Sequence, residues 1–152
     1  MYSATLLVHS WLRWAVIATG LIAILGGIIG VARRGQWTPA DDRAGFWFIT
    51  SLDLQLLLGL VLYFFLSPFT AEAMKDFAAA MKDPGLRFWA VEHGFGMIVG
   101  VALAHVGRAR TRRVDVTRRH KMAAIFYGLA LVAILISIPW PGTPNGRPLL
   151  RW

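Results

Sequence analysis

Seven ionisable side chains lie within or at the edge of long apolar stretches of the sequence. They are His9, Arg13, Asp53, Glu92, His93, His105 and His120. Ionisable groups inside a membrane span are energetically costly and usually face the interior of the helix bundle, so each is a candidate for function if these stretches cross a membrane. Imidazole is a common metal ligand, and two imidazoles on different helices can bind one haem iron from its two sides.

Four apolar stretches are expected to position these side chains. A helix needs about 20 apolar residues to cross the ~30 Å hydrocarbon layer. The predicted spans cover residues 6–31, 46–66, 88–107 and 122–139. The 152 residues are 57% hydrophobic with a mean hydropathy of +0.55, which is too apolar for an ordinary soluble domain. We therefore predict one all-α membrane domain over residues 1–152, folded as a polytopic four-helix bundle.

The distribution of basic residues predicts the orientation of the bundle. Ten lie in the connections at residues 32–45 and 108–121. The opposite side holds Lys75, Lys82, Arg87, Arg147 and Arg151. Basic residues concentrate on the cytoplasmic side, so both termini are expected outside, in the periplasm if the protein lies in a bacterial inner (cytoplasmic) membrane. The same loops explain the net charge of +8 without nucleic acid, and they would attract anionic membrane lipids.

The outer connection between the second and third spans has a helical pattern of its own. Thr70 can act as an N-cap, and Pro84 with its neighbours ends the pattern. One helical face carries Met74, Phe77, Ala78 and Met81. We predict a short helix over residues 71–82 on the outer membrane surface, where it anchors to the interface, covers a pocket or docks a partner.

His9 and His93 are expected at the same depth, near the outer ends of the first and third spans. This arrangement can hold a haem, with one imidazole on each side of the iron. Arg13, one turn from His9, or Arg87, just before His93, can pair with a haem propionate. Alternatively, each histidine forms a hydrogen bond to Glu92 or to a backbone carbonyl, and Glu92 forms an ion pair with Arg13.

Two glycines follow His93 on the same helical face. Gly96 and Gly100 lie three and seven residues further on, and a bare strip of this kind lets a flat porphyrin approach the backbone. The same spacing is typical of a small-xxx-small seam between packed membrane helices. Spacing alone does not separate a cofactor role from a packing role.

A second pair of histidines is expected at the inner level. His105 ends the third span and His120 opens the fourth, and Asp53 can reach His105 and accept a hydrogen bond from its ring. Alternatively, both histidines belong to the basic inner collar. Asp53 has its own alternative partners, which are Ser51, Gln55 and Tyr127.

Several kinds of chemistry are excluded or unsupported. The chain has no cysteine, which excludes disulfides, iron–sulfur clusters and thioether-attached haem. Neither a nucleophile–base set nor a phosphate-binding loop is present. We therefore expect an electron carrier or an accessory subunit rather than an enzyme.

Five short motifs occur along the chain in the order HSWLRW around His9, DLQLLLGLVLYF in the second span, RFWAVEH ending at His93, RRHKMA at His120 and SIPWP closing the fourth span. From His9 to about Pro141 they resemble a family of small bacterial four-helix membrane proteins labelled cytochrome b-like. The resemblance implies a haem b protein of a membrane electron-transport chain. It implies His9 and His93 as axial ligands, with His105 and His120 as a second pair.

Two functions are therefore expected. The first is a b-type cytochrome that binds one or two haem b groups and exchanges electrons with a quinol or a periplasmic carrier. The alternative is a non-catalytic accessory subunit of a larger respiratory or photosynthetic complex, without haem, which packs against other membrane proteins. The tail at residues 140–152 is basic and rich in proline and glycine, as in a docking segment.

Overall fold

The computed structural model describes residues 1–150, and these residues form helices and turns without strands. Arg151 and the end of the tail lie outside the described residues. Four helical stretches are long and apolar enough to cross a membrane, namely Tyr2–Ala32, Pro39–Leu66, Pro84–Arg113 and Val116–Ser137. The prediction of an all-helical chain with four membrane-length helices is confirmed, although each stretch begins several residues before its predicted start.

The described residues contain helical elements both within and between these four stretches. In chain order these are α1 (Tyr2–Ala32), α2 (Pro39–Val61), η1 (Leu62–Leu66), α3 (Pro68–Ala73), α4 (Phe77–Ala80), α5 (Pro84–Arg87), η2 (Phe88–Glu92), α6 (His93–Arg113) and α7 (Val116–Ser137). The elements η1 and η2 are single π-helical turns at the end of α2 and the start of α6. Such turns are rare and often adjoin functional sites.

The start of α2 lies seven residues before the predicted span because a capping box fixes it. The Thr38 backbone N–H donates to the Asp41 carboxylate at 2.8 Å, and the Asp41 N–H donates to the Thr38 hydroxyl at 3.4 Å. Pro39 occupies the first helical position, where its missing N–H leaves no hydrogen bond unmade. The predicted span counted only apolar residues and so omitted this polar turn.

The outer connection differs from the predicted helix over residues 71–82, because two short helices, α3 and α4, replace it. The N-cap of α3 is Ser67, whereas Thr70 donates its hydroxyl hydrogen to the Tyr63 carbonyl at 2.7 Å. Asp76 leaves helical geometry and caps α4 with its carboxylate. Aspartate favours such caps over helix interiors, so a new helix begins after Asp76.

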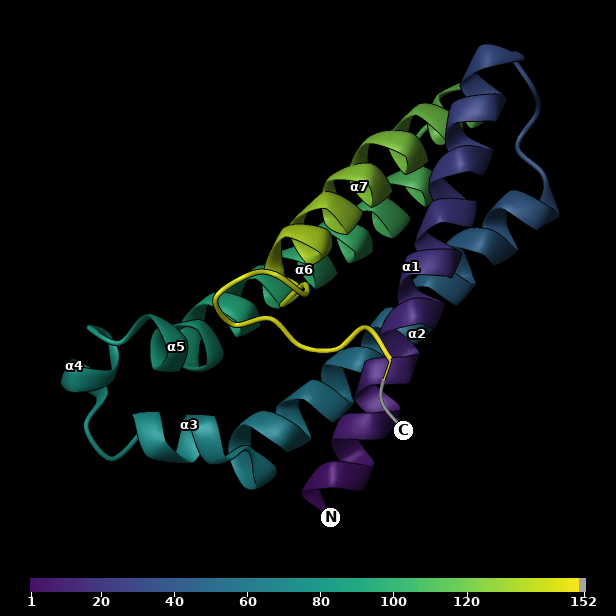
Figure 1. Ribbon diagram of the computed structural model, residues 1–152. Coiled ribbons are helices and arrows are strands. Elements are labelled where there is room, and N and C mark those ends of the chain that lie inside the picture. Colours follow the sequence, from purple (N-terminus) through teal and green to yellow (C-terminus); the bar gives the residue numbers. More distant parts are fainter. Residues whose placement is uncertain (151–152) are drawn as a thin grey trace.

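The long helices converge at one end of the molecule and separate at the other. α6 packs most extensively on α7, and α1 packs on both α2 and α7, while α2 and α6 meet much less. In Figure 1, α1 and α2 diverge from α6 and α7 toward the end that carries the N-terminus and α3 to α5. We call this the terminal end, and the opposite end, with the connection at residues 114–115, the basic end.

An ion pair joins α2 to α6 near the basic end. The Arg108 guanidinium donates to both carboxylate oxygens of Asp42, at 2.8 and 2.9 Å. The Arg108 side chain is only 11% exposed, whereas Asp42 is 45% exposed. A bidentate pair of this kind is geometrically specific, and it fixes the helices where they approach each other.

Replacing Asp42 with asparagine is expected to destabilise the protein by about 1.5 kcal/mol, because a nearly buried guanidinium loses its charged partner. Thermal unfolding in detergent should show a fall in Tm of several degrees. Glu72→Gln is the matched control, since Glu72 pairs with Lys75 where the side chains are 57% and 71% exposed. An exposed pair contributes less than about 1 kcal/mol, so equal shifts in the two variants would contradict the prediction.

Candidate functional site

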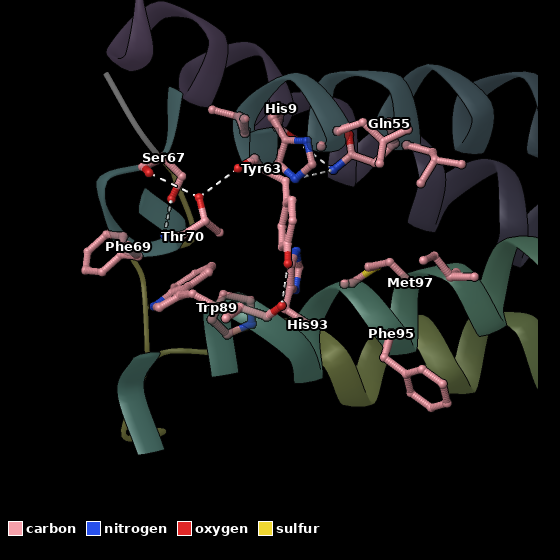
Figure 2. A pocket seen from close by; sticks show the side chains of 18 of the residues that line it. His9, Gln55, Tyr63, Ser67, Phe69, Thr70, Trp89, His93, Phe95 and Met97 are labelled. Atoms are coloured by element: carbon pink, nitrogen blue, oxygen red, sulfur yellow. Dashed lines mark hydrogen bonds between the residues drawn. The ribbon is translucent and has the colours of Figure 1, made fainter. Parts of the chain in front are cut away.

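A cavity of about 610 Å³ lies between the diverging helices at the terminal end. This volume is within the range of about 300–1,000 Å³ that is usual for ligand sites. Its wall is mainly apolar and comes from α1, α2, η1, α3, α4, η2, α6, α7 and the segment after α7. The side chains in the wall that carry a nitrogen atom or a phenol group are Tyr2, His9, Arg13, Gln55, Tyr63, Trp89, His93 and Arg147. Figure 2 shows His9 and Gln55 on one side and His93 with Trp89 on the other.

His93 has a defined tautomer. Its Nδ1 lies 2.8 Å from the Ser137 carbonyl oxygen, and a carbonyl can only accept, so Nδ1 carries the proton. In the neutral ring Nε2 then keeps its lone pair. The ring is flanked by the rings of Phe88 and Trp89, with centroids 5.9 and 5.7 Å away. Metal-binding histidines are commonly oriented by such a bond from the other ring nitrogen to a backbone carbonyl.

The last turn of α7 explains why this carbonyl is available. In a continuing helix the Leu135 and Ser137 carbonyls would accept from residues 139 and 141, but Pro139 and Pro141 have no N–H. Side chains supply the missing donors. The indole nitrogen of Trp140 donates to the Leu135 carbonyl at 2.7 Å, and the His93 ring donates to the Ser137 carbonyl. The SIPWP motif therefore creates the acceptor that orients this imidazole.

His9 is held by Gln55. The Gln55 amide nitrogen lies 3.2 Å from His9 Nε2 and 3.1 Å from the His9 carbonyl oxygen, and it donates to both. The proton of the neutral ring is therefore on Nδ1. Among the described residues His9 Nδ1 and Gln55 Oε1 are buried without a hydrogen-bond partner. Buried polar atoms are seldom left in this state.

Arg13 lies in the cavity wall, as a propionate partner would require, but Arg87 does not. Arg87 instead donates to the Glu92 carboxylate at 2.6 Å. The two residues are five apart across η2, which matches the i to i+5 repeat of a π-helix. The expected ion pair between Glu92 and Arg13 is thus replaced by this local one.

The glycines after His93 face α7 rather than the cavity. A Cβ at Gly96 would overlap the Ser137 side chain, and one at Gly100 would lie 2.6 Å from Ile134 Cγ1. Neither glycine is in the cavity wall. Of the two roles left open by their spacing, the structure shows helix packing. Gly94 does line the cavity, and a Cβ there would meet nothing within 4 Å.

His105 and His120 have separate surroundings. The predicted hydrogen bond between His105 and Asp53 is present at 2.8 Å, on the outside of the bundle, where the side chains are 50% and 44% exposed. His120 is buried at 4% exposure, with its ring 5.0 Å from that of Trp37 and its Nε2 3.5 Å from Asp41. The structure does not bring the two histidines together in one site.

Sequence reasoning missed three functional groups of the cavity. Gln55 and Tyr63 share one face of the second long helix with Gly59, and His9 packs on this face. The Tyr63 hydroxyl donates to the Ala90 carbonyl at 2.7 Å, which connects η1 to η2. The spacing of four residues between members of this face was the available signal. Arg147 arrives from the far end of the chain, and no local pattern predicts its position.

No protein-family model, curated protein or solved structure matches the chain. The fold and the cavity define its class as an all-helical chain with four membrane-length helices and an apolar cavity with histidines in its wall.

Proposed function

We propose that the protein is a membrane b-type cytochrome-like protein that binds one haem b in this cavity and transfers electrons. The observation that carries the proposal is the pair His9 and His93, which come from α1 and α6 and line the same apolar cavity. The donor chemistry fits, because the hydrogen bond from His93 Nδ1 leaves Nε2 available for iron. The resemblance of the motifs around both histidines to cytochrome b-like proteins gives additional support.

His9 and His93 would hold the haem iron. Gln55 currently donates to His9 Nε2, so its amide would have to turn away to free this lone pair. Bound haem supplies an iron that gains and loses one electron at a time. The chain's own contribution is to orient both rings and to surround the site with apolar side chains that exclude water, which influences the reduction potential.

The cavity reaches the molecular surface between η1 and α6. Phe64, Phe95 and Ile98 belong to its wall and are 67%, 68% and 56% exposed. In a membrane this opening would face lipid rather than water. An apolar cofactor that partitions into the bilayer would therefore have a direct route to both histidines.

The proposed location is a bacterial inner membrane with both termini in the periplasm, as the ten basic residues at the basic end support. The cavity would then lie near the periplasmic surface. Electron exchange with a quinol or with a periplasmic carrier is consistent with this depth.

An accessory subunit of a larger membrane complex is the second candidate, and one observation favours it. The pair of His105 and Asp53 is about half exposed on the outside of two membrane-length helices. Ionisable groups at such positions usually face protein, so a neighbouring chain could cover this pair.

The test is the visible spectrum of the purified protein. We expect expression in a haem-replete bacterial host to yield a coloured protein with sharp α and Soret bands in the dithionite-reduced minus oxidised spectrum. A pyridine haemochrome assay should give one haem per chain. A colourless but folded protein would overturn the proposal and favour the accessory subunit, whose partners would then be sought by co-purification.

A further inference from the structure

The segment after α7 folds back over the terminal end of the bundle. We call residues 139–150 the strap. Its backbone is fixed by a hydrogen bond from Arg147 N to the Pro139 carbonyl at 3.0 Å. Further along, the Leu149 carbonyl accepts from the Arg13 guanidinium at 2.6 Å and from the Trp14 indole at 3.2 Å. The strap thus runs from α7 to α1, and Figure 1 shows it in yellow between these helices.

The strap brings a second guanidinium group to the cavity. Arg147 lines the wall together with Arg13. Its guanidinium carbon lies 4.9 Å from the ring centroid of Phe69 and 5.1 Å from that of Trp89, so two aromatic faces hold the cation. Within residues 1–150, Arg147 forms no ion pair with a carboxylate.

The charged side chains in the cavity wall are all positive. Among the described residues its wall contains two arginines and no aspartate or glutamate. A guanidinium in a mainly apolar environment is stabilised by an anionic partner, and it binds carboxylates with particular strength because its donors match their geometry. The wall is therefore complementary to an apolar ligand that carries a carboxylate near Arg147.

We propose that Arg147 binds a carboxylate of the ligand and that the strap forms the outer wall of its site. This inference rests on the proposed function, in which the carboxylate is a haem propionate. Arg147 then takes the role that the sequence suggested for Arg87.

The experiment compares haem b with its dimethyl ester, in which the propionates are neutral. Wild type and the variants Arg147→Gln, Arg147→Lys and Arg87→Gln are loaded with each compound, and transfer to excess apomyoglobin gives the dissociation rate. For Arg147→Gln we expect haem b to leave about tenfold faster, as befits the loss of one charged hydrogen bond. The dimethyl ester of haem b should dissociate from Arg147→Gln at the same rate as from the wild type.

The other two variants serve as controls. Arg147→Lys keeps the charge but loses the planar stacking, so its effect on haem b should be smaller than that of Arg147→Gln. Arg87→Gln should leave both rates unchanged, because Arg87 lies outside the cavity wall. Equal acceleration of haem b and its ester in Arg147→Gln would show that Arg147 only holds the strap, which would overturn the inference. A wild-type protein that binds neither compound would overturn the proposed function as well.

Discussion

The His93→Asn variant is expected to lose the sharp reduced α band and at least about nine-tenths of its bound haem while keeping its fold. The asparagine amide nitrogen can take the place of Nδ1 and donate to the Ser137 carbonyl, but asparagine has no counterpart of Nε2. The variant therefore separates the ligand role of the ring from its structural role. Reduced minus oxidised spectra and a pyridine haemochrome assay measure haem binding. Thermal unfolding measures the structural role of the ring.

Two further variants complete this test. His93→Ala removes the donor as well and leaves the Ser137 carbonyl unpaired, so it should be less stable than His93→Asn by about 1–3 kcal/mol. His105→Ala should keep the wild-type spectrum, because His105 lies on the outside of the bundle. An undiminished α band in His93→Asn would contradict the assignment of His93 as a ligand.

Gly27→Ala is expected to destabilise the bundle by up to about 3 kcal/mol through overpacking. A Cβ at Gly27 would lie 2.8 Å from the Ala124 backbone nitrogen and 3.1 Å from the His120 carbonyl oxygen. Because these are backbone atoms of α7, the contact can be relieved only if α1 and α7 move apart. Thermal unfolding should show a Tm lower by several degrees.

The neighbouring residue supplies a matched control for this effect. A Cβ at Gly26 would come no closer than 3.4 Å, to a carboxylate oxygen of Asp41, which is ordinary van der Waals contact. Alanine also has a higher helix propensity than glycine by about 1 kcal/mol, so Gly26→Ala should be neutral or stabilising. Equal losses in the two variants would show that the close contact at Gly27 is not the cause.

The long helices could be predicted from the sequence because membrane-length apolar stretches are a strong signal. The ends of these helices were harder to predict, since α2 begins at a polar capping box centred on Thr38 rather than at an apolar residue. The outer connection was predicted as one helix because its apolar residues repeat with helical spacing. That pattern does not include the competition from the Asp76 side chain, which caps the start of a new helix.

The candidate site was predicted in part. His9, His93 and Arg13 could be found because depth in a membrane follows from position along each span, and the structure places all three in one cavity wall. The roles of Gly96 and Gly100 could not be decided, because they depend on helix rotation. Arg147 could not be found at all, since its position depends on the folding back of the strap over α3 and η2.

The hydrogen bond that orients His93 has a consequence for the response of the protein to acidity. Its acceptor is a carbonyl oxygen left free by a proline, whereas a carboxylate acceptor would gain a proton as the pH falls. A peptide carbonyl does not titrate in the physiological range. The orientation of the imidazole is therefore set by the covalent structure at the end of α7, and acid has no carboxylate acceptor to protonate in this bond.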